Sequence, residues 1–254
     1  MSSPFARYVA IGDSFTEGVG DELPGGQVRG WADLVALGLA EASDAPVGYA
    51  NLAIRGKLLA PIIAGQLEPA LAQAPDLLSI CGGGNDLMRP RVEISNIVDL
   101  LGVVVDRAIE QGAHVLMLSG ANPSRHLPMG ALIQRRGDQL AVACRAEFTR
   151  PGVTLVDNWA DAELEERRYW SADKLHLNAL GHTRIASRVL DALDVPPPAD
   201  WATDARAPAD DRVQGTAAYY REFVLPWIGR RLTGRSSGDG RPPKRPALEP
   251  VDLD

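Results

Sequence analysis

The segment YVAIGDS at residues 8–14 contains the first predicted strand of this chain. A short apolar run without polar alternation is typical of a parallel strand that is buried on both faces. The run ends abruptly in Gly12-Asp13-Ser14, so a serine directly follows the predicted strand. Because ligands bind beyond the carboxyl ends of the strands in open parallel sheets, Ser14 becomes a candidate site residue.

The rest of the chain alternates short apolar runs with longer helical patterns. Further predicted strands lie at residues 47–52, 77–82, 115–119 and 153–156. The predicted helices lie at residues 31–42, 59–71, 93–111, 131–148 and 178–193. This alternation indicates βαβ units with right-handed crossovers. We therefore expect an α/β fold, a three-layer α/β/α sandwich with a parallel sheet in the middle.

The sequence divides into three parts. The predicted domain covers residues 1–195, and a spacer that opens with three prolines leads into a helix within residues 196–233. The apolar spacing predicts this helix over residues 210–232, with a kink at Pro226. Three roles are open for this helix: packing on the domain, covering the active-site cleft, or binding a partner. The tail at residues 234–254 holds four prolines and little to bury, which predicts a disordered or surface-wrapped segment.

Composition narrows the class of protein. The 254 residues are 45% hydrophobic, enough for a sizeable core, and the net charge of −7 argues against nucleic acid as a partner. Cys81 and Cys144 form neither a disulfide framework nor a metal-ligand pattern. We see no secretion signal and no apolar stretch of membrane-span length, so we expect a cytoplasmic protein without stable membrane insertion. The oligomeric state is left open.

A second short segment, Asp173-Lys174-Leu175-His176, supplies an acid and a histidine three residues apart. A serine hydroxyl is a weak nucleophile until a base takes its proton, and the base needs an anion to fix its tautomer. His176 and Asp173 can serve Ser14 in these two ways. The alternative is that Asp173 is a turn or cap residue before the helix at residue 178, and Gly-Asp-Ser also occurs by chance in turns.

Candidate donors for a developing oxyanion come from two other segments. Three glycines precede Asn85, whose neutral amide can donate a hydrogen bond without adding charge. Gly56 offers a backbone N–H with no side chain in the way. The alternatives are an ordinary glycine-rich turn, with Asn85 capping a helix, and an ordinary turn glycine at position 56.

These segments together resemble the SGNH (GDSL) hydrolases, a family defined by four sequence blocks. The blocks correspond to residues 11–18, 51–56, 83–86 and 173–178, in the order of the family. The resemblance covers roughly residues 5–195. It implies a flavodoxin-like, five-stranded parallel sheet, in agreement with the strand pattern.

The resemblance also implies roles for individual residues. Ser14 would be the nucleophile, His176 the general base and then acid, and Asp173 the residue that orients the histidine. The oxyanion hole would use the backbone N–H groups of Ser14 and Gly56 and the side-chain amide of Asn85. No metal and no organic cofactor are implied.

Three residues are candidate substrate contacts. Asp13 lies next to Ser14, and His126 follows the fourth predicted strand. Arg55 stands directly before Gly56, where many relatives have a small residue. If Arg55 faces the site, it would bind an anionic substrate group; the alternative, which we favour slightly, is a surface salt bridge. His182 lies on the last predicted helix, where packing is the expected role.

The expected reaction is hydrolysis of a small-molecule carboxylic ester through an acyl-enzyme. Two alternatives remain at this point: an acyltransferase that uses the same site, and a catalytically silent binding module. The sequence leaves the acyl length and the alcohol open. Residues 15–30 and 122–130 are the expected walls of the substrate site.

Overall fold

The computed structural model describes residues 4–201, 219–225 and 236–253. Its central sheet has six strands in the order β5-β4-β3-β1-β2-β6. The strands are β1 (Arg7–Gly12), β2 (Gly48–Asn51), β3 (Leu77–Cys81), β4 (His114–Leu118), β5 (Val153–Val156) and β6 (Arg245–Pro250). Strands β1 to β5 are parallel. The predicted α/β sandwich with a five-stranded parallel sheet is thus confirmed, and one further strand is added to it.

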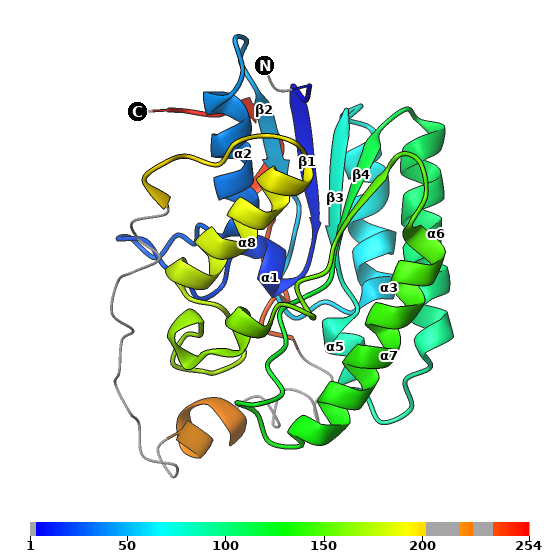
Figure 1. The fold of residues 1–254 in the computed structure, drawn as a ribbon, viewed down its shortest axis with the longest axis vertical. Helices are drawn as coiled ribbons and strands as arrows, with labels where there is room; N and C mark the ends of the chain where they lie inside the picture. Colours follow the sequence, from blue (N-terminus) through cyan, green and yellow to red (C-terminus); the bar gives the residue numbers. More distant parts are fainter. Residues whose placement is uncertain (1–3, 202–218, 226–235, 254) are drawn as a thin grey trace.

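Helices cover both faces of the sheet (Figure 1). One face carries α2 (Trp31–Glu41) and α8 (Ala179–Ala192), on the left of the strands in Figure 1. The opposite face carries α3 (Leu59–Ile62), α4 (Glu68–Leu71), α6 (Ile94–Glu110) and α7 (Gly130–Phe148). A π-helical turn, η1 (Ile63–Leu67), joins α3 to α4, so the helix predicted at residues 59–71 is one segment with a local change of winding.

The continuous apolar run of β1 reflects burial on both faces. Tyr8 and Ala10 pack in the core beneath α2 and α8, whereas Val9 and Ile11 pack in the core beneath α3, α6 and α7. All four side chains are fully buried. Successive residues of a strand point to opposite faces, so a strand between two helical layers needs apolar residues at every position.

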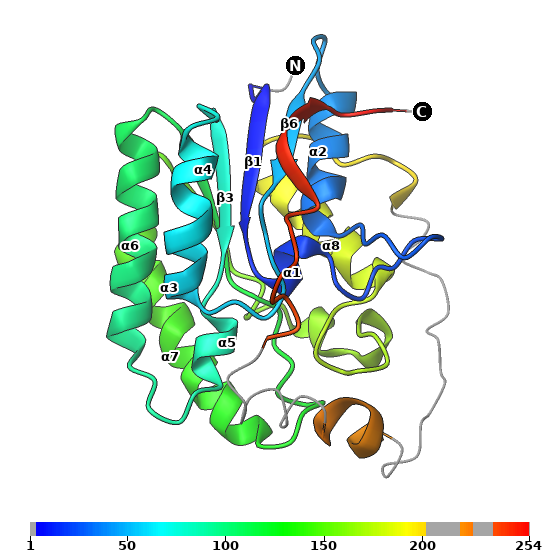
Figure 2. The same ribbon diagram turned by 180° about the vertical axis from the view of Figure 1, so that it is seen from behind.

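The sixth strand comes from the segment that was expected to be disordered or surface-wrapped. Strand β6 pairs antiparallel with β2 at the sheet edge, with Tyr49 opposite Glu249 (Figure 2, where β6 is red). Pro246 and Pro250 fit such a strand because an edge position does not need every N–H. The prolines and the exposed side chains hid this strand from the sequence pattern.

The chain order of the strands reverses between β1 and β3, which places a crevice between the loops that follow them. Strand β1 leads into α1 (Ser14–Glu17) and β3 leads into α5 (Gly84–Leu87), so both short helices lie at the carboxyl edge of the sheet (Figure 1). This edge is where the candidate site residues were expected.

The predicted C-terminal helix falls mostly outside the described residues, including its expected kink at Pro226. Residues 219–225 are described and contain a π-helical turn, η4 (Tyr220–Val224). Within the ranges that the structure describes, no helix has both the length and the apolar character to span a bilayer.

Candidate active site

Ser14 stands at the start of α1, directly beyond the end of β1. Asp13 caps this helix, because its Oδ1 accepts a hydrogen bond from the backbone N–H of Phe15 at 3.1 Å. The turn between strand and helix is tight: a Cβ on Gly12 would lie 2.6 Å from the carbonyl oxygen of Cys81. The glycine therefore lets β1 and β3 approach closely at the point where Ser14 emerges.

Ser14, His176 and Asp173 form a continuous chain of hydrogen bonds, which we call the histidine side of the site. His176 Nε2 lies 3.0 Å from Ser14 Oγ, and His176 Nδ1 lies 2.5 Å from Asp173 Oδ2. An ionised carboxylate only accepts hydrogen bonds, so Nδ1 carries the proton and Nε2 is free to accept from the serine hydroxyl. This arrangement can move a proton from the serine to the imidazole.

The carboxylate of Asp173 is fixed by several donors. Its Oδ1 accepts from the backbone N–H groups of Leu175 and His176, both at 3.0 Å, and from Ser171 Oγ at 2.7 Å. Burial raises the pKa of Asp173, but the hydrogen bonds and charge of His176 outweigh it and hold that pKa well below its usual range. Asp173 therefore stays anionic beside the imidazole.

Asp13 and Asn85 form the other half of the site, which we call the amide side. Asn85 Nδ2 donates to Asp13 Oδ2 and to the backbone carbonyl of Lys57, both at 3.0 Å. Burial raises the pKa of Asp13 to about 6, against smaller opposing effects of Phe15 N–H and His176. Both amide protons of Asn85 thus have protein acceptors, so binding an oxyanion requires one of these bonds to be shared or exchanged.

Gly56 adopts a left-handed backbone conformation with φ +75° beside the C-terminal segment. A Cβ at this position would lie 2.3 Å from Ser236 Oγ, which itself donates to the carbonyl of Arg55 at 3.2 Å. Among the hydrogen bonds within the described ranges, none is donated by the backbone N–H of Gly56 or of Ser14. Gly56 is not among the described residues that line the cavity beside Ser14, so the role of these two N–H groups as oxyanion donors stays a prediction.

Arg55 is not brought to the substrate cavity as a free cation. Its backbone N–H and its guanidinium both donate to the buried carboxylate of Glu17, with Nε at 2.8 Å and N–H at 2.6 Å. Arg55 is thus in a salt bridge, the alternative to substrate binding. This geometry gives no support to the role of Arg55 as a contact for an anionic substrate group. No local pattern indicates this partner, because Glu17 lies 38 residues earlier in the chain.

The other histidines take structural positions. His126 Nε2 lies 2.9 Å from the carbonyl oxygen of Glu165, and its ring packs 5.4 Å from that of Trp170, so it lies behind the cavity wall. His182 is fully buried and accepts from the backbone N–H of Trp31 at 3.2 Å. Burial lowers the pKa of His182 to about 4, which keeps it neutral.

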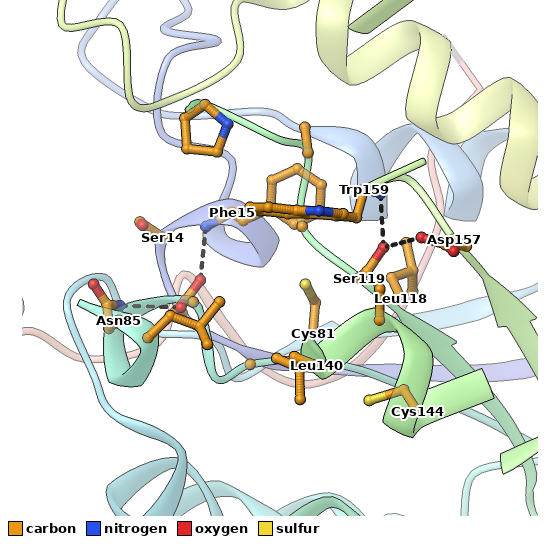
Figure 3. A pocket seen from close by; sticks show the side chains of 18 of the residues that line it. Ser14, Phe15, Cys81, Asn85, Leu118, Ser119, Leu140, Cys144, Asp157 and Trp159 are labelled. Atoms are coloured by element: carbon orange, nitrogen blue, oxygen red, sulfur yellow. Dashed lines mark hydrogen bonds between the residues drawn. The ribbon is translucent and has the colours of Figure 1, made fainter. Parts of the chain in front are cut away.

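A cavity of about 140 Å³ extends from Ser14, Asn85 and His176 into the protein (Figure 3). Phe15 and Pro123 line it, as expected for the segments at residues 15–30 and 122–130. Most of its wall, however, comes from the ends of β3, β4 and β5 and from the inner face of α7. Sequence reasoning missed this wall because its apolar residues look like ordinary core.

Two further residues near the site come from the C-terminal segments. Tyr219 donates from its hydroxyl to the backbone carbonyl of Asp173 at 3.1 Å. Lys244 is mostly buried, and its Nζ donates to the carbonyl of Glu17 at 2.6 Å and to Asp33 Oδ2 at 2.5 Å. These contacts join segments more than 40 residues apart, which a sequence pattern cannot reveal.

Comparison with known proteins identifies the class. Residues 10–184 match the model of the GDSL-like Lipase/Acylhydrolase family, and the chain belongs to this family. The resemblance inferred from the four sequence blocks is confirmed, and the chain is a hydrolase of ester bonds. A search of curated proteins found no significant match.

Several solved structures share the fold. The lipase Lip_vut3 from a goat rumen metagenome has 20% identity and a TM-score of 0.63, with 73% of this chain and 96% of that chain covered. The acetylxylan esterase Axe2 from Geobacillus stearothermophilus has 20% identity and a TM-score of 0.58, covering 76% and 96%. TesA has 23% identity and a TM-score of 0.59, covering 74% and 97%.

Proposed function

We propose that the protein is a serine esterase that cleaves carboxylic esters through an acyl-enzyme intermediate. The hydrogen-bonded chain from Ser14 through His176 to Asp173 carries this proposal. Its order of atoms is the one that nucleophilic acyl transfer needs: a hydroxyl, an imidazole that accepts its proton, and an anion that fixes the imidazole. Membership of an acylhydrolase family supports the same reaction.

In the first half of the reaction, Ser14 Oγ attacks the ester carbonyl carbon while His176 Nε2 takes the hydroxyl proton. Asp173 stabilises the resulting imidazolium, because it is anionic and already bonded to Nδ1. The tetrahedral intermediate then collapses. The bond to the alcohol breaks, and His176 passes its proton to the leaving alkoxide oxygen.

The negative charge that develops on the carbonyl oxygen would be stabilised by three hydrogen-bond donors. They are the backbone N–H groups of Ser14 and Gly56 and the side-chain amide of Asn85. In the second half of the reaction, water attacks the acyl-enzyme with His176 as base. Ser14 is released, and the carboxylic acid leaves.

The substitution Ser14→Ala tests this function. We expect it to lower kcat/KM for short p-nitrophenyl esters by on the order of 10⁴–10⁶, because the nucleophile is lost. Circular dichroism should show an unchanged fold. The matched control is Ser95→Ala, an exposed serine on α6, which should retain full activity. Hydrolysis at the wild-type rate in Ser14→Ala would reject the proposal.

A further inference from the structure

The cavity beside Ser14, at about 140 Å³, is larger than an acetyl group requires. Figure 3 shows Ser14 and Asn85 on one side of it and Cys144 and Asp157 on the opposite side, with Cys81 and Leu140 between them. The cavity therefore runs inward from the site, between the carboxyl ends of β3 to β5 and helix α7.

The walls of this inner part are largely apolar. Leu101, Met117, Ile133 and Ala141 line it, and each is no more than 7% exposed. Cys144 also lines it, and burial raises the pKa of its thiol to about 11, so this group stays neutral as well. Such a surface favours an uncharged, apolar ligand.

The polar residues at the end of the cavity opposite Ser14, where the Arg145 side chain is partly exposed, form hydrogen bonds and an ion pair with one another. Asp157 forms an ion pair with Arg145, and Ser119 Oγ donates to Asp157 Oδ1 at 3.1 Å. Ser119 Oγ also accepts from the backbone N–H of Trp159 at 2.9 Å. Because these hydrogen bonds are already made, the end of the cavity offers no unpaired charge to a polar substrate group.

We propose that this cavity binds the acyl chain of the ester and selects an apolar chain of about six carbons over acetyl. The inference rests on the proposed function. An apolar cavity of about 150 Å³ elsewhere holds one benzene molecule, so a volume of 140 Å³ fits a chain of similar carbon number. Ala141, a small residue on α7, lines this cavity, so a larger side chain at this position would reduce its volume.

The acyl group suits the cavity better than the alcohol does. The acyl chain stays attached to Ser14 through both halves of the reaction, so an inward cavity can hold it throughout. The alcohol must leave and water must take its place beside His176. A largely apolar cavity would hinder that exchange, because water and the alcohol gain few hydrogen bonds from its walls.

Two isomeric esters test the assignment with the whole protein. Ethyl hexanoate and hexyl acetate have the same composition but carry the long chain on opposite sides of the ester bond. Since each buried methylene is worth roughly fourfold, we expect kcat/KM to be at least tenfold higher for ethyl hexanoate. A ratio of one or below would overturn the inference.

Substitution at Ala141 tests the proposed wall. Ala141→Leu fills the cavity, so the ratio for the two esters should fall at least fivefold, with thermal unfolding used to confirm a folded variant. Ala141→Val provides a smaller change if the leucine disturbs folding. The matched control is Val142→Leu on the same helix, where the side chain is 59% exposed and the ratio should not change. An unchanged ratio in both Ala141 variants would contradict the inference.

The two proposals fail in different ways. Loss of all hydrolysis in Ser14→Ala, together with a ratio near one in the wild type, would reject the acyl-chain cavity and leave the serine esterase intact. Persistent hydrolysis in Ser14→Ala would reject the serine esterase itself.

Discussion

The histidine side and the amide side of the active site differ in how their hydrogen bonds relate to the reaction. On the histidine side, the bonds from Ser14 to His176 and from His176 to Asp173 are the ones that proton transfer uses. On the amide side, the Asn85 protons are directed at Asp13 and at the Lys57 carbonyl. We infer that proton transfer is preorganised, whereas charge stabilisation requires a local exchange of hydrogen bonds.

The two carboxylates show the same contrast. Asp173 receives bonds from three N–H or O–H groups besides the imidazole, and its pKa is held low. Asp13 is just as close to the site, yet burial raises its pKa to about 6. Two acids in one crevice therefore have opposite electrostatic surroundings, as expected if one stabilises a cation and the other orients a neutral amide.

The largest effect is expected where the histidine side is broken. Asp173→Asn should lower kcat by about 10⁴, with little change in KM, because an amide donates to Nδ1 and leaves the proton on Nε2. Steady-state kinetics on a short ester measures this. Asp99→Asn, an exposed aspartate on α6, is the matched control. A loss below tenfold would show that Asp173 does not fix the tautomer.

A smaller effect is expected on the amide side. Asn85→Ala should lower kcat by about 10²–10³, because one of three oxyanion donors is lost while the two backbone N–H groups remain. Asn96→Ala, which removes an exposed amide on α6, should have no effect. If kcat for Asn85→Ala stays within threefold of wild type, Asn85 is only a structural residue.

The strand that carries Ser14 and the main site residues could be predicted from the sequence, whereas the tertiary contacts around them could not. The buried run at residues 8–12 predicted β1, and the sequence blocks predicted that Ser14 and His176 meet, as their 3.0 Å contact shows, whereas the role of Gly56 stays a prediction. Those predictions rest on local pattern and on the resemblance. The pairing of Arg55 with Glu17 depends on tertiary approach, which local pattern does not encode.

The C-terminal segment illustrates the same limit. A strand rich in proline and exposed at the sheet edge has none of the alternation that identifies β-structure, so β6 was not predicted. Its position became visible only through pairing with β2. The inner cavity escaped prediction for a related reason, since an empty space between core residues leaves no mark in the sequence.

The smallest expected effect concerns stability and pH. A carboxyl with a higher pKa in the folded state contributes stability that is complete below its unfolded value of 3.8 and is lost as pH rises through about 6. Asp13→Asn should therefore remove a fall of up to about 3 kcal/mol in unfolding free energy between pH 4 and 7. Urea unfolding across this range measures it.

The low pKa of Asp173 gives this pH experiment an internal contrast. Its stabilising contribution is present above its unfolded pKa and is lost as pH falls, so it has the opposite sign to that of Asp13. Because Asp173 is present in both proteins, its contribution cancels, and the unfolding free energy of wild type minus that of Asp13→Asn should increase toward low pH. A difference that does not change between pH 4 and 7 would contradict the raised pKa of Asp13.

Covalent labelling reports directly whether Ser14 is the activated nucleophile. A p-nitrophenyl alkylphosphonate should form a bond between Ser14 Oγ and phosphorus, with release of p-nitrophenolate. Mass spectrometry of the digested protein is expected to find one adduct, on the peptide that contains Ser14, and none in Ser14→Ala. An adduct on another residue, or none in the folded wild-type protein, would contradict the assignment of Ser14 as the nucleophile.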